Sequence, residues 1–125
     1  MTVLVTGGLG FIGAKTVLQL LKRNIPVVVA DLDIEKNKSK LEKNILKIGK
    51  DNVKVKYQKL DITDHQQIEN IFQNNKIDSV INLAYGIGSI CEENPLLASK
   101  INIVGTTSMF DMVVKYKIRR LVFAS

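Results

Sequence analysis

The segment Thr6–Gly13, which reads TGGLGFIG, decides how this chain folds. It follows a short β-branched run at residues 2–5 (TVLV), which has the composition of a buried strand. Beyond Phe11 the apolar residues recur at helical spacing, and a second apolar run at 27–30 ends in Asp31. The helical set consists of Ile12, Val17, Leu18, Leu20 and Leu21. This order predicts a strand, a glycine-rich turn, a helix and a second strand.

The glycines of this segment satisfy the pattern G-x-G-x-x-G at positions 8, 10 and 13. Gly7 and Gly8 permit the tight turn, Gly10 lets the backbone approach a pyrophosphate, and Gly13 lets helix and strand pack closely. The helix N-terminus offers free N–H groups to phosphates, and Asp31 is placed to accept hydrogen bonds from ribose hydroxyls. The pattern and its flanking elements predict a dinucleotide site. A purely structural strand–helix–strand turn is the alternative.

The rest of the chain continues the alternation of strands and helices. We expect strands at 2–5, 26–31, 53–57, 78–84 and 119–125, and helices at 11–23, 35–48, 63–75 and 94–117. Thr63 followed by Gln66 is a capping-box signature, Asn94-Pro95 is a strong start for the longest helix, and Gly49 is the expected cap of the second. The pattern predicts a Rossmann-like, doubly wound parallel sheet of five strands in the order 3-2-1-4-5, with helices on both faces.

The length and composition narrow the possible classes of protein. The chain has 125 residues, of which 46% are hydrophobic and 24% charged, as expected for one α/β domain. It contains no apolar run long enough to span a membrane and begins directly with a strand, so we expect a cytoplasmic protein. The single Cys91 excludes an internal disulfide. With His65 as the only histidine, no metal site is expected.

The formal charge of +6 raises the alternative of nucleic-acid binding. Nine lysines lie between Lys36 and Lys59, with no arginine and with Tyr57 as the only aromatic residue among them. Such a segment lacks the stacking platform that single strands need, so a solvated helix face is favoured over a nucleic-acid partner. A nucleic-acid site would reveal itself by an affinity that falls steeply with salt.

Five segments occur in a fixed order along the chain. They are TGGLGFIG with Asp31, Asp61-Ile62, Asn82-Leu83-Ala84-Tyr85, Asn94-Pro95, and Asn102 with Gly105-Thr106. Together they resemble the N-terminal half of the extended short-chain dehydrogenase/reductase family, the nucleotide-sugar epimerases and dehydratases. In that family the Asp-hydrophobic pair contacts adenine, and the segment like NLAY lies beside the cofactor, although Tyr85 is an unusually large final residue.

The resemblance implies that NAD is the cofactor. The implied cofactor-binding residues are Gly7, Gly10, Phe11, Ile12, Gly13, Asp31, Leu32, Asp61, Ile62, Leu83, Ala84, Tyr85, Asn102 and Ser125. We expect NAD(H) to be preferred over NADP(H), because the Asp31 carboxylate repels a 2′-phosphate. The next two residues, Leu32 and Asp33, provide no arginine to receive one.

The chain departs from the family in the residues that carry the chemistry. The family depends on a Tyr-x-x-x-Lys pair, whereas no tyrosine of this chain is followed by lysine four positions later. The family's catalytic Ser/Thr falls about one place after Ser125, and the C-terminal substrate-binding part is absent. We therefore expect no catalytic residue here and no turnover by these residues alone.

The sequence thus indicates the N-terminal, NAD-binding part of an epimerase/dehydratase-like oxidoreductase, shortened by cloning, gene annotation or gene splitting. A stand-alone, non-catalytic NAD-binding module is the alternative; downstream DNA that encodes Tyr-x-x-x-Lys would decide between the two. The apolar stretch 121–124 (LVFA) would then lack cover, so we expect self-association along that sheet edge or pairing with the missing C-terminal part.

Overall fold

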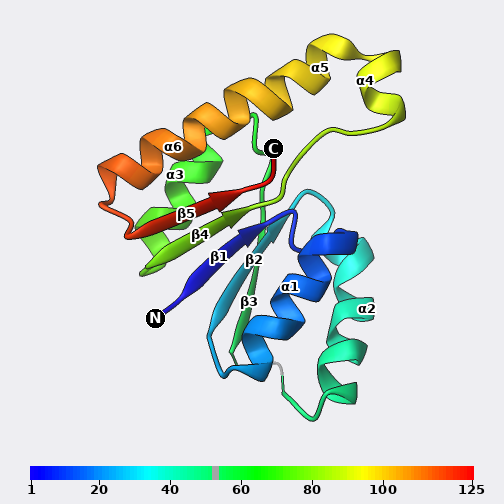
Figure 1. Cartoon of the computed structure of the whole chain (residues 1–125), viewed down its shortest axis with the longest axis vertical. Coiled ribbons are helices and arrows are strands. Elements are labelled where there is room, and N and C mark those ends of the chain that lie inside the picture. Colours follow the sequence, from blue (N-terminus) through cyan, green and yellow to red (C-terminus); the bar gives the residue numbers. More distant parts are fainter. Residues whose placement is uncertain (52–53) are drawn as a thin grey trace.

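The computed structural model describes residues 1–51 and 54–125, so Val53, expected to begin the third strand, lies outside the described residues. The strands are β1 (Val3–Thr6), β2 (Val27–Asp31), β3 (Val55–Lys59), β4 (Ser79–Asn82) and β5 (Arg120–Phe123). The helices are α1 (Phe11–Lys22), α2 (Ile34–Lys47), α3 (His65–Asn74), α4 (Ser89–Glu93), α5 (Pro95–Ser99), the π-helical segment η1 (Lys100–Gly105) and α6 (Thr106–Lys115). Figure 1 shows them in chain order.

The five strands form one parallel sheet in the order β3-β2-β1-β4-β5, which confirms the predicted topology. The register aligns Thr6 with Ala30 on one side and with Asn82 on the other. The carboxyl ends of β1, β2 and β4 therefore meet at one edge. In a doubly wound sheet this edge is where ligands bind.

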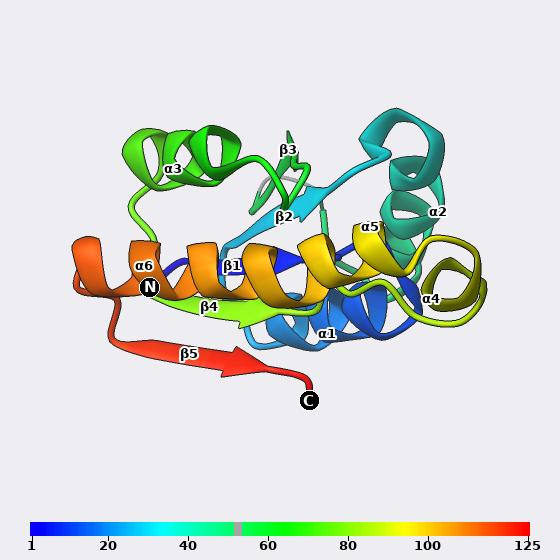
Figure 2. The ribbon, with the colours of Figure 1, turned by 90° about the horizontal axis from the view of Figure 1, so that it is seen from above.

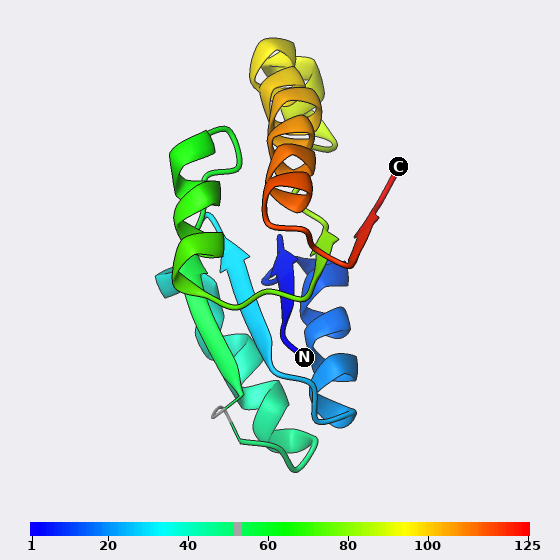
Figure 3. The ribbon, with the colours of Figure 1, turned by 90° about the vertical axis from the view of Figure 1, so that its left-hand side faces the viewer.

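Two apolar cores lie on opposite faces of the sheet because successive strand residues point to opposite sides. Val3 and Val5 pack with α1 and α2, through Val17 and Ile45, whereas Leu4 packs on the face of α3 and α6. Figure 2 and Figure 3 show α1 and α2 on one face and α3 with the run α5–η1–α6 on the other. The sheet is thus covered on both faces, as predicted.

The lysine-rich helix α2 buries an apolar stripe and exposes its charge. Leu41 and Ile45 are buried against the sheet. Its exposed lysines are Lys36, Lys40, Lys43 and Lys47. This arrangement matches the predicted solvated helix face.

The start of α3 differs from the predicted capping box at Thr63 and Gln66. The N-cap is Asp64, whose side chain accepts a hydrogen bond from the Gln67 backbone N–H (3.1 Å) and one from the Gln67 side-chain amide (2.9 Å). Thr63 is used elsewhere, because its N–H and its hydroxyl both donate to Asp61 Oδ1 (2.9 and 2.7 Å). The N-cap therefore lies one residue after the predicted position, and the Gln67 side-chain oxygen accepts from the Asp61 N–H instead of from the N-cap N–H.

The segment after β4 also differs in detail from the prediction. Asn94 caps α5 by accepting from the Leu97 N–H (3.1 Å), and helical structure then continues through η1 and α6. The short helix α4 occupies residues for which only a loop was expected. The π-helical turn η1 was not predicted, because no residue type specifies it.

β5 is an edge strand of the sheet, and part of it is exposed. It pairs with β4, and the Phe123 ring packs edge-on against Phe110, with ring centroids 5.4 Å apart. Val122 and Phe123 nevertheless remain 50% and 45% exposed. Figure 2 shows β5 outermost in the sheet, with the C-terminus beyond it.

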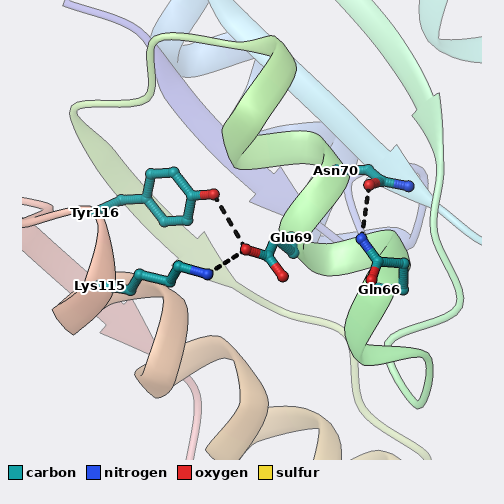
Figure 4. Close-up of polar contacts among 5 residues, drawn as sticks. All are labelled: Gln66, Glu69, Asn70, Lys115 and Tyr116. Carbon is teal, nitrogen blue, oxygen red and sulfur yellow. Dashed lines mark hydrogen bonds and ion pairs between the residues drawn. The ribbon is translucent and has the colours of Figure 1, made fainter.

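A polar cluster joins α3 to the end of α6 (Figure 4). The Glu69 carboxylate pairs with the Lys115 ammonium and accepts a hydrogen bond from the Tyr116 hydroxyl (3.4 Å). The Tyr116 ring stacks on Phe72, with centroids 5.4 Å apart. The hydrogen bond from Lys115 is the main reason that the pKa of Glu69 is lowered.

Replacing Glu69 should therefore destabilise the chain in a pH-dependent way. A carboxylate with a lowered folded-state pKa stabilises the fold above its unfolded value, here 4.5, and loses this effect as pH falls through the folded value. We expect Glu69→Gln to lower the melting temperature by roughly 1 to 3 °C at pH 7. The difference from wild type should vanish in the acid range.

Gln66→Ala provides the control for this measurement. It removes a neutral hydrogen bond on the same helix, from Gln66 Nε2 to Asn70 Oδ1 (3.0 Å), as Figure 4 shows. Its effect on the melting temperature should be the same at acid and neutral pH. A Glu69→Gln effect that persists unchanged at pH 3 would contradict the electrostatic explanation.

Candidate functional site

A cavity of about 360 Å³ opens at the carboxyl ends of the strands. It lies over the glycine-rich turn, with β2 and β3 on one side and β4 on the other. The lining residues are Gly7, Leu9, Gly10, Ala30, Asp31, Leu32, Asn37, Leu60, Asp61, Ile62, Leu83, Ala84, Tyr85 and Ile101. The wall is mostly apolar, and two carboxylates project from the ends of neighbouring strands.

The turn between β1 and α1 depends on glycine at two positions. Gly7 has a φ of +62°, and a Cβ there would lie 2.6 Å from the Leu83 carbonyl oxygen. At Gly13 a Cβ would lie 2.0 Å from the Gly7 carbonyl oxygen. No other residue fits either position without displacing backbone. The first turn of α1 is thereby seated directly against the end of β1.

The N-terminus of α1 faces the same region without a side-chain cap. Gly10 is the N-cap and has no side chain to bond the helix N–H groups. A helix leaves its first N–H groups without intrahelical partners, and the dipole adds partial positive charge there. The backbone N–H groups of Phe11, Ile12 and Gly13 are thus the donors that this helix end offers to an anion.

Asp31 ties the glycine-rich turn to the end of β2. Its Oδ2 accepts from the Leu9 N–H (3.0 Å) and its Oδ1 from the Leu32 N–H (2.8 Å). These bonds fix the carboxylate at the cavity wall. Each carboxylate oxygen has a second lone pair, so Asp31 can still accept hydrogen bonds from ligand hydroxyls.

Asp61 is held in a comparable way at the end of β3. Its Oδ1 accepts both bonds from Thr63, and its own N–H donates to the Gln67 side-chain oxygen (2.9 Å). The adjacent Ile62 packs against Gly105 so closely that a Cβ at Gly105 would lie 2.9 Å from Ile62 Cγ2. Gly105 ends η1, so the run α5–η1–α6 supports this wall of the cavity.

A buried polar pair joins β1 to β4 beneath the cavity. The Thr6 hydroxyl donates to Asn82 Oδ1, and both side chains are fully buried. The Leu83 N–H then donates to the Thr6 carbonyl (3.1 Å). These contacts set the position of the chain where it leaves β4 as Leu83, Ala84 and Tyr85.

The residue after Tyr85, Gly86, is held by Asn102 of η1. Asn102 Oδ1 accepts from the Gly86 N–H (2.8 Å), and Asn102 Nδ2 donates to the Gly86 carbonyl (2.9 Å). The Cys91 thiol is 3.2 Å from the same carbonyl oxygen. The segment after β4 is thus held at Leu83 and at Gly86.

The remaining tyrosines lie away from the cavity lining. Tyr57 is on β3, where burial, helped by the negative charge of Glu42, raises its pKa to about 12. Tyr116 belongs to the cluster of Glu69 at the far end of α6. Among the described residues that line the cavity, none is a lysine.

The family model described as NAD dependent epimerase/dehydratase matches residues 3–125. The chain belongs to this family. Within the described residues, no group of side chains could hold a metal ion, and no helix has the length and apolar character needed to cross a membrane.

Members of the epimerase/dehydratase family with known activities are similar over the whole chain. UDP-glucose 4-epimerase 2 of Arabidopsis thaliana is 36% identical over 126 residues, which cover 99% of this chain and 36% of the plant protein. The Yersinia enterocolitica UDP-glucose 4-epimerase is 35% identical over 127 residues, covering 100% and 37%. The chain therefore spans about a third of the length of these relatives.

Solved structures of the family have the same fold. The Thermus thermophilus UDP-glucose 4-epimerase, in complex with NAD, has a TM-score of 0.83 at 29% identity and is matched over 100% of this chain and 37% of its own. The Bifidobacterium longum enzyme, in complex with NAD+ and UDP, has a TM-score of 0.82 at 28% identity, with the same coverage.

The structure brings most of the predicted cofactor residues to one cavity. Those that line it are Gly7, Gly10, Asp31, Leu32, Asp61, Ile62, Leu83, Ala84 and Tyr85. The other predicted residues are Phe11, Ile12, Gly13, Asn102 and Ser125. Gly13 is buried under the turn, and the Phe11 and Ile12 side chains are 79% and 62% exposed.

Asn102 and Ser125 lie outside the cavity lining. The Asn102 amide uses its oxygen and its nitrogen on the Gly86 backbone, so in this structure it positions the segment after β4 instead of lining the cavity. Ser125 is an exposed residue beyond the end of β5. These two assignments to cofactor binding remain predictions, as do those of the residues that line the cavity.

Sequence reasoning missed five residues that line the cavity: Leu9, Ala30, Asn37, Leu60 and Ile101. Leu9 lies inside the glycine motif, and Ala30 and Leu60 immediately precede the two acidic residues, so strand-end position could have identified these three. Asn37 and Ile101 come from α2 and η1. Only the packing of those helices brings them to the cavity.

Proposed function

We propose that this chain is the NAD-binding portion of a nucleotide-sugar epimerase/dehydratase-like oxidoreductase. The observation that carries the proposal is the convergence of three groups on one cavity. They are the glycine-rich turn with its uncapped helix N-terminus, the Asp31 carboxylate and the Asp61 carboxylate. A dinucleotide needs an anion site flanked by acceptors for ribose and base, and these groups fit that need.

Each group would hold a different part of the cofactor. The N–H groups of α1 would bind the pyrophosphate, and Asp31 would accept from the adenosine ribose hydroxyls. Asp61 would then lie on the adenine side, above the wall formed by Leu60 and Ile62. The NAD in the T. thermophilus complex and the NAD+ in the B. longum complex support a dinucleotide cofactor. The UDP in the B. longum complex supports a nucleotide-sugar substrate.

NAD, when bound, supplies hydride transfer, and this chain contributes binding and orientation. The family's proton exchange requires a tyrosine whose pKa is lowered by a neighbouring lysine. Here no lysine is among the described residues of the cavity wall, and the pKa of Tyr57 is raised, which is the opposite change. We infer that the acid/base pair and the sugar site belong to a part of the protein outside these 125 residues.

The 125 residues alone should therefore show no epimerase, dehydratase or dehydrogenase turnover. The measurement is an assay of the purified chain with NAD and UDP-glucose, followed at the absorbance of NADH and by separation of the sugar products. Activity that follows the chain through every purification step would contradict the inference. It would require an acid/base pair other than Tyr-x-x-x-Lys.

NAD should raise the melting temperature of the chain. Ligand at about 100 times its dissociation constant adds about 2.7 kcal/mol to the free energy of unfolding, a shift of roughly 10 °C for a domain of this size. Gly10→Val should abolish the shift, because its side chain would enter the wall of the cavity. The φ of −70° suits any residue, but a Cβ at Gly10 would lie 3.2 Å from the Gly7 carbonyl oxygen, so the backbone must shift by a few tenths of an ångström. A cooperative melt of the variant without NAD shows that it folds.

Gln19→Val is the matched control, since it places the same side chain on the exposed face of α1. It should keep the full NAD shift. A wild-type chain that melts at the same temperature with and without saturating NAD would overturn the proposed function.

The Asp31 carboxylate should make the chain prefer NAD over NADP. Its charge would lie beside the extra phosphate of NADP, and like charges at close range repel strongly in a partly buried site. We expect Asp31→Asn to reduce the NAD/NADP affinity ratio by about tenfold or more, measured by calorimetric titration.

Asp33→Asn removes an equal charge from an exposed position two residues away and should leave the ratio unchanged. Equal affinity of the wild-type chain for NAD and NADP would contradict the prediction.

A further inference from the structure

Tyr85 occupies the side of the cavity opposite the two carboxylates. Asp31 is the last residue of β2 and Asp61 follows β3, whereas Tyr85 follows β4, and β1 with its glycine-rich turn lies between them. If Asp31 holds the adenosine ribose and the α1 N-terminus the pyrophosphate, the second nucleoside must extend toward β4. On the proposed function, the nicotinamide end of the cofactor therefore lies beside Tyr85.

Tyr85 is the only aromatic residue among the described residues that line this cavity. Its neighbours in the wall on this side are Leu83, Ala84 and Ile101, which carry no charge. The residue is half-buried, so its ring is partly removed from water. An aromatic ring in such a place interacts more strongly with a cation than one at the open surface.

The backbone around Tyr85 is held on both sides. Two residues before it, the Leu83 N–H donates to the Thr6 carbonyl (3.1 Å). Immediately after it, Gly86 makes the two hydrogen bonds with the Asn102 amide (2.8 and 2.9 Å). The backbone that carries the ring is therefore held in place before a ligand binds, which lowers the entropic cost of binding.

We propose that the Tyr85 ring forms one wall of the nicotinamide site and selects the oxidised form of the cofactor. The nicotinamide ring of NAD+ carries a positive charge, whereas that of NADH is neutral. The electron-rich face of Tyr85 attracts the cationic ring and has no comparable interaction with the neutral one. The chain accordingly binds NAD+ more tightly, relative to NADH, than the same cavity without an aromatic ring.

The test is calorimetric titration of the chain with NAD+, NADH and ADP-ribose, which lacks the nicotinamide. Tyr85→Leu should weaken NAD+ binding by about three- to tenfold, weaken NADH binding less, and leave ADP-ribose binding unchanged. Tyr85→Phe should keep the wild-type ratio of NAD+ to NADH affinity, because the aromatic face remains. Tyr85→Met, with a flexible apolar side chain, should behave as Tyr85→Leu does.

Phe123→Leu is the control for loss of an aromatic ring elsewhere, because Phe123 lies on β5 and does not line the cavity. It should leave all three affinities unchanged. Unaltered binding of ADP-ribose to each Tyr85 variant shows that the variant is folded and that the adenosine half of the site is intact.

Two results would overturn the inference and are distinguishable from each other. If wild-type chain binds ADP-ribose but Tyr85→Leu leaves the NAD+/NADH ratio unchanged, the selection by charge is wrong while the proposed function stands. If wild-type chain binds none of the three ligands, the proposed function fails, and the inference that depends on it fails too.

Discussion

The architecture depends on the close contact between two glycines. A side chain at Gly13 would collide with the Gly7 carbonyl, and one at Gly7 would collide with the Leu83 carbonyl. These two contacts bring the first turn of α1, the end of β1 and the end of β4 together at one point. The free N–H groups of the helix and the carboxylate of Asp31 face the same cavity because this point is so tightly packed.

Polar bonds outside the ladder of the sheet complete this arrangement. Thr6 and Asn82 are buried and bonded to each other across β1 and β4, and Asp31 bonds the backbone of the turn through Leu9. The bond between Thr6 and Asn82 is buried, so it favours one position of β1 against β4, whereas the bond from Leu9 to Asp31 sets the glycine-rich turn against the end of β2. The geometry of the cavity is thus set by a few short-range bonds at the strand ends, while the two apolar cores supply the stability.

The fold could be predicted because its determinants are local in the sequence. The glycine spacing, the β-branched strands and the acidic residue at the end of β2 each have a mechanical reason that a single chain displays. The N-cap at Asp64 could not be predicted from the sequence, since it depends on the two hydrogen bonds by which Thr63 donates to the Asp61 side chain. The same holds for Asn102, whose amide meets Gly86 only when η1 packs above Ile62 through Gly105.

The pairing of β1 with β4 has a consequence for the order in which the chain acquires structure. Thr6 and Asn82 are 76 residues apart, whereas β2 and β3 follow β1 closely along the chain. During synthesis the residues of β1, β2 and β3 therefore leave the ribosome before the residues of β4, which pair with the other side of β1. The glycine-rich turn then gains its contact with Leu83 only after β4 has emerged. A nascent polypeptide that ends before β4 therefore contains three strands and three helices of the fold but lacks Leu83, Ala84, Tyr85 and Ile101 of the cavity wall.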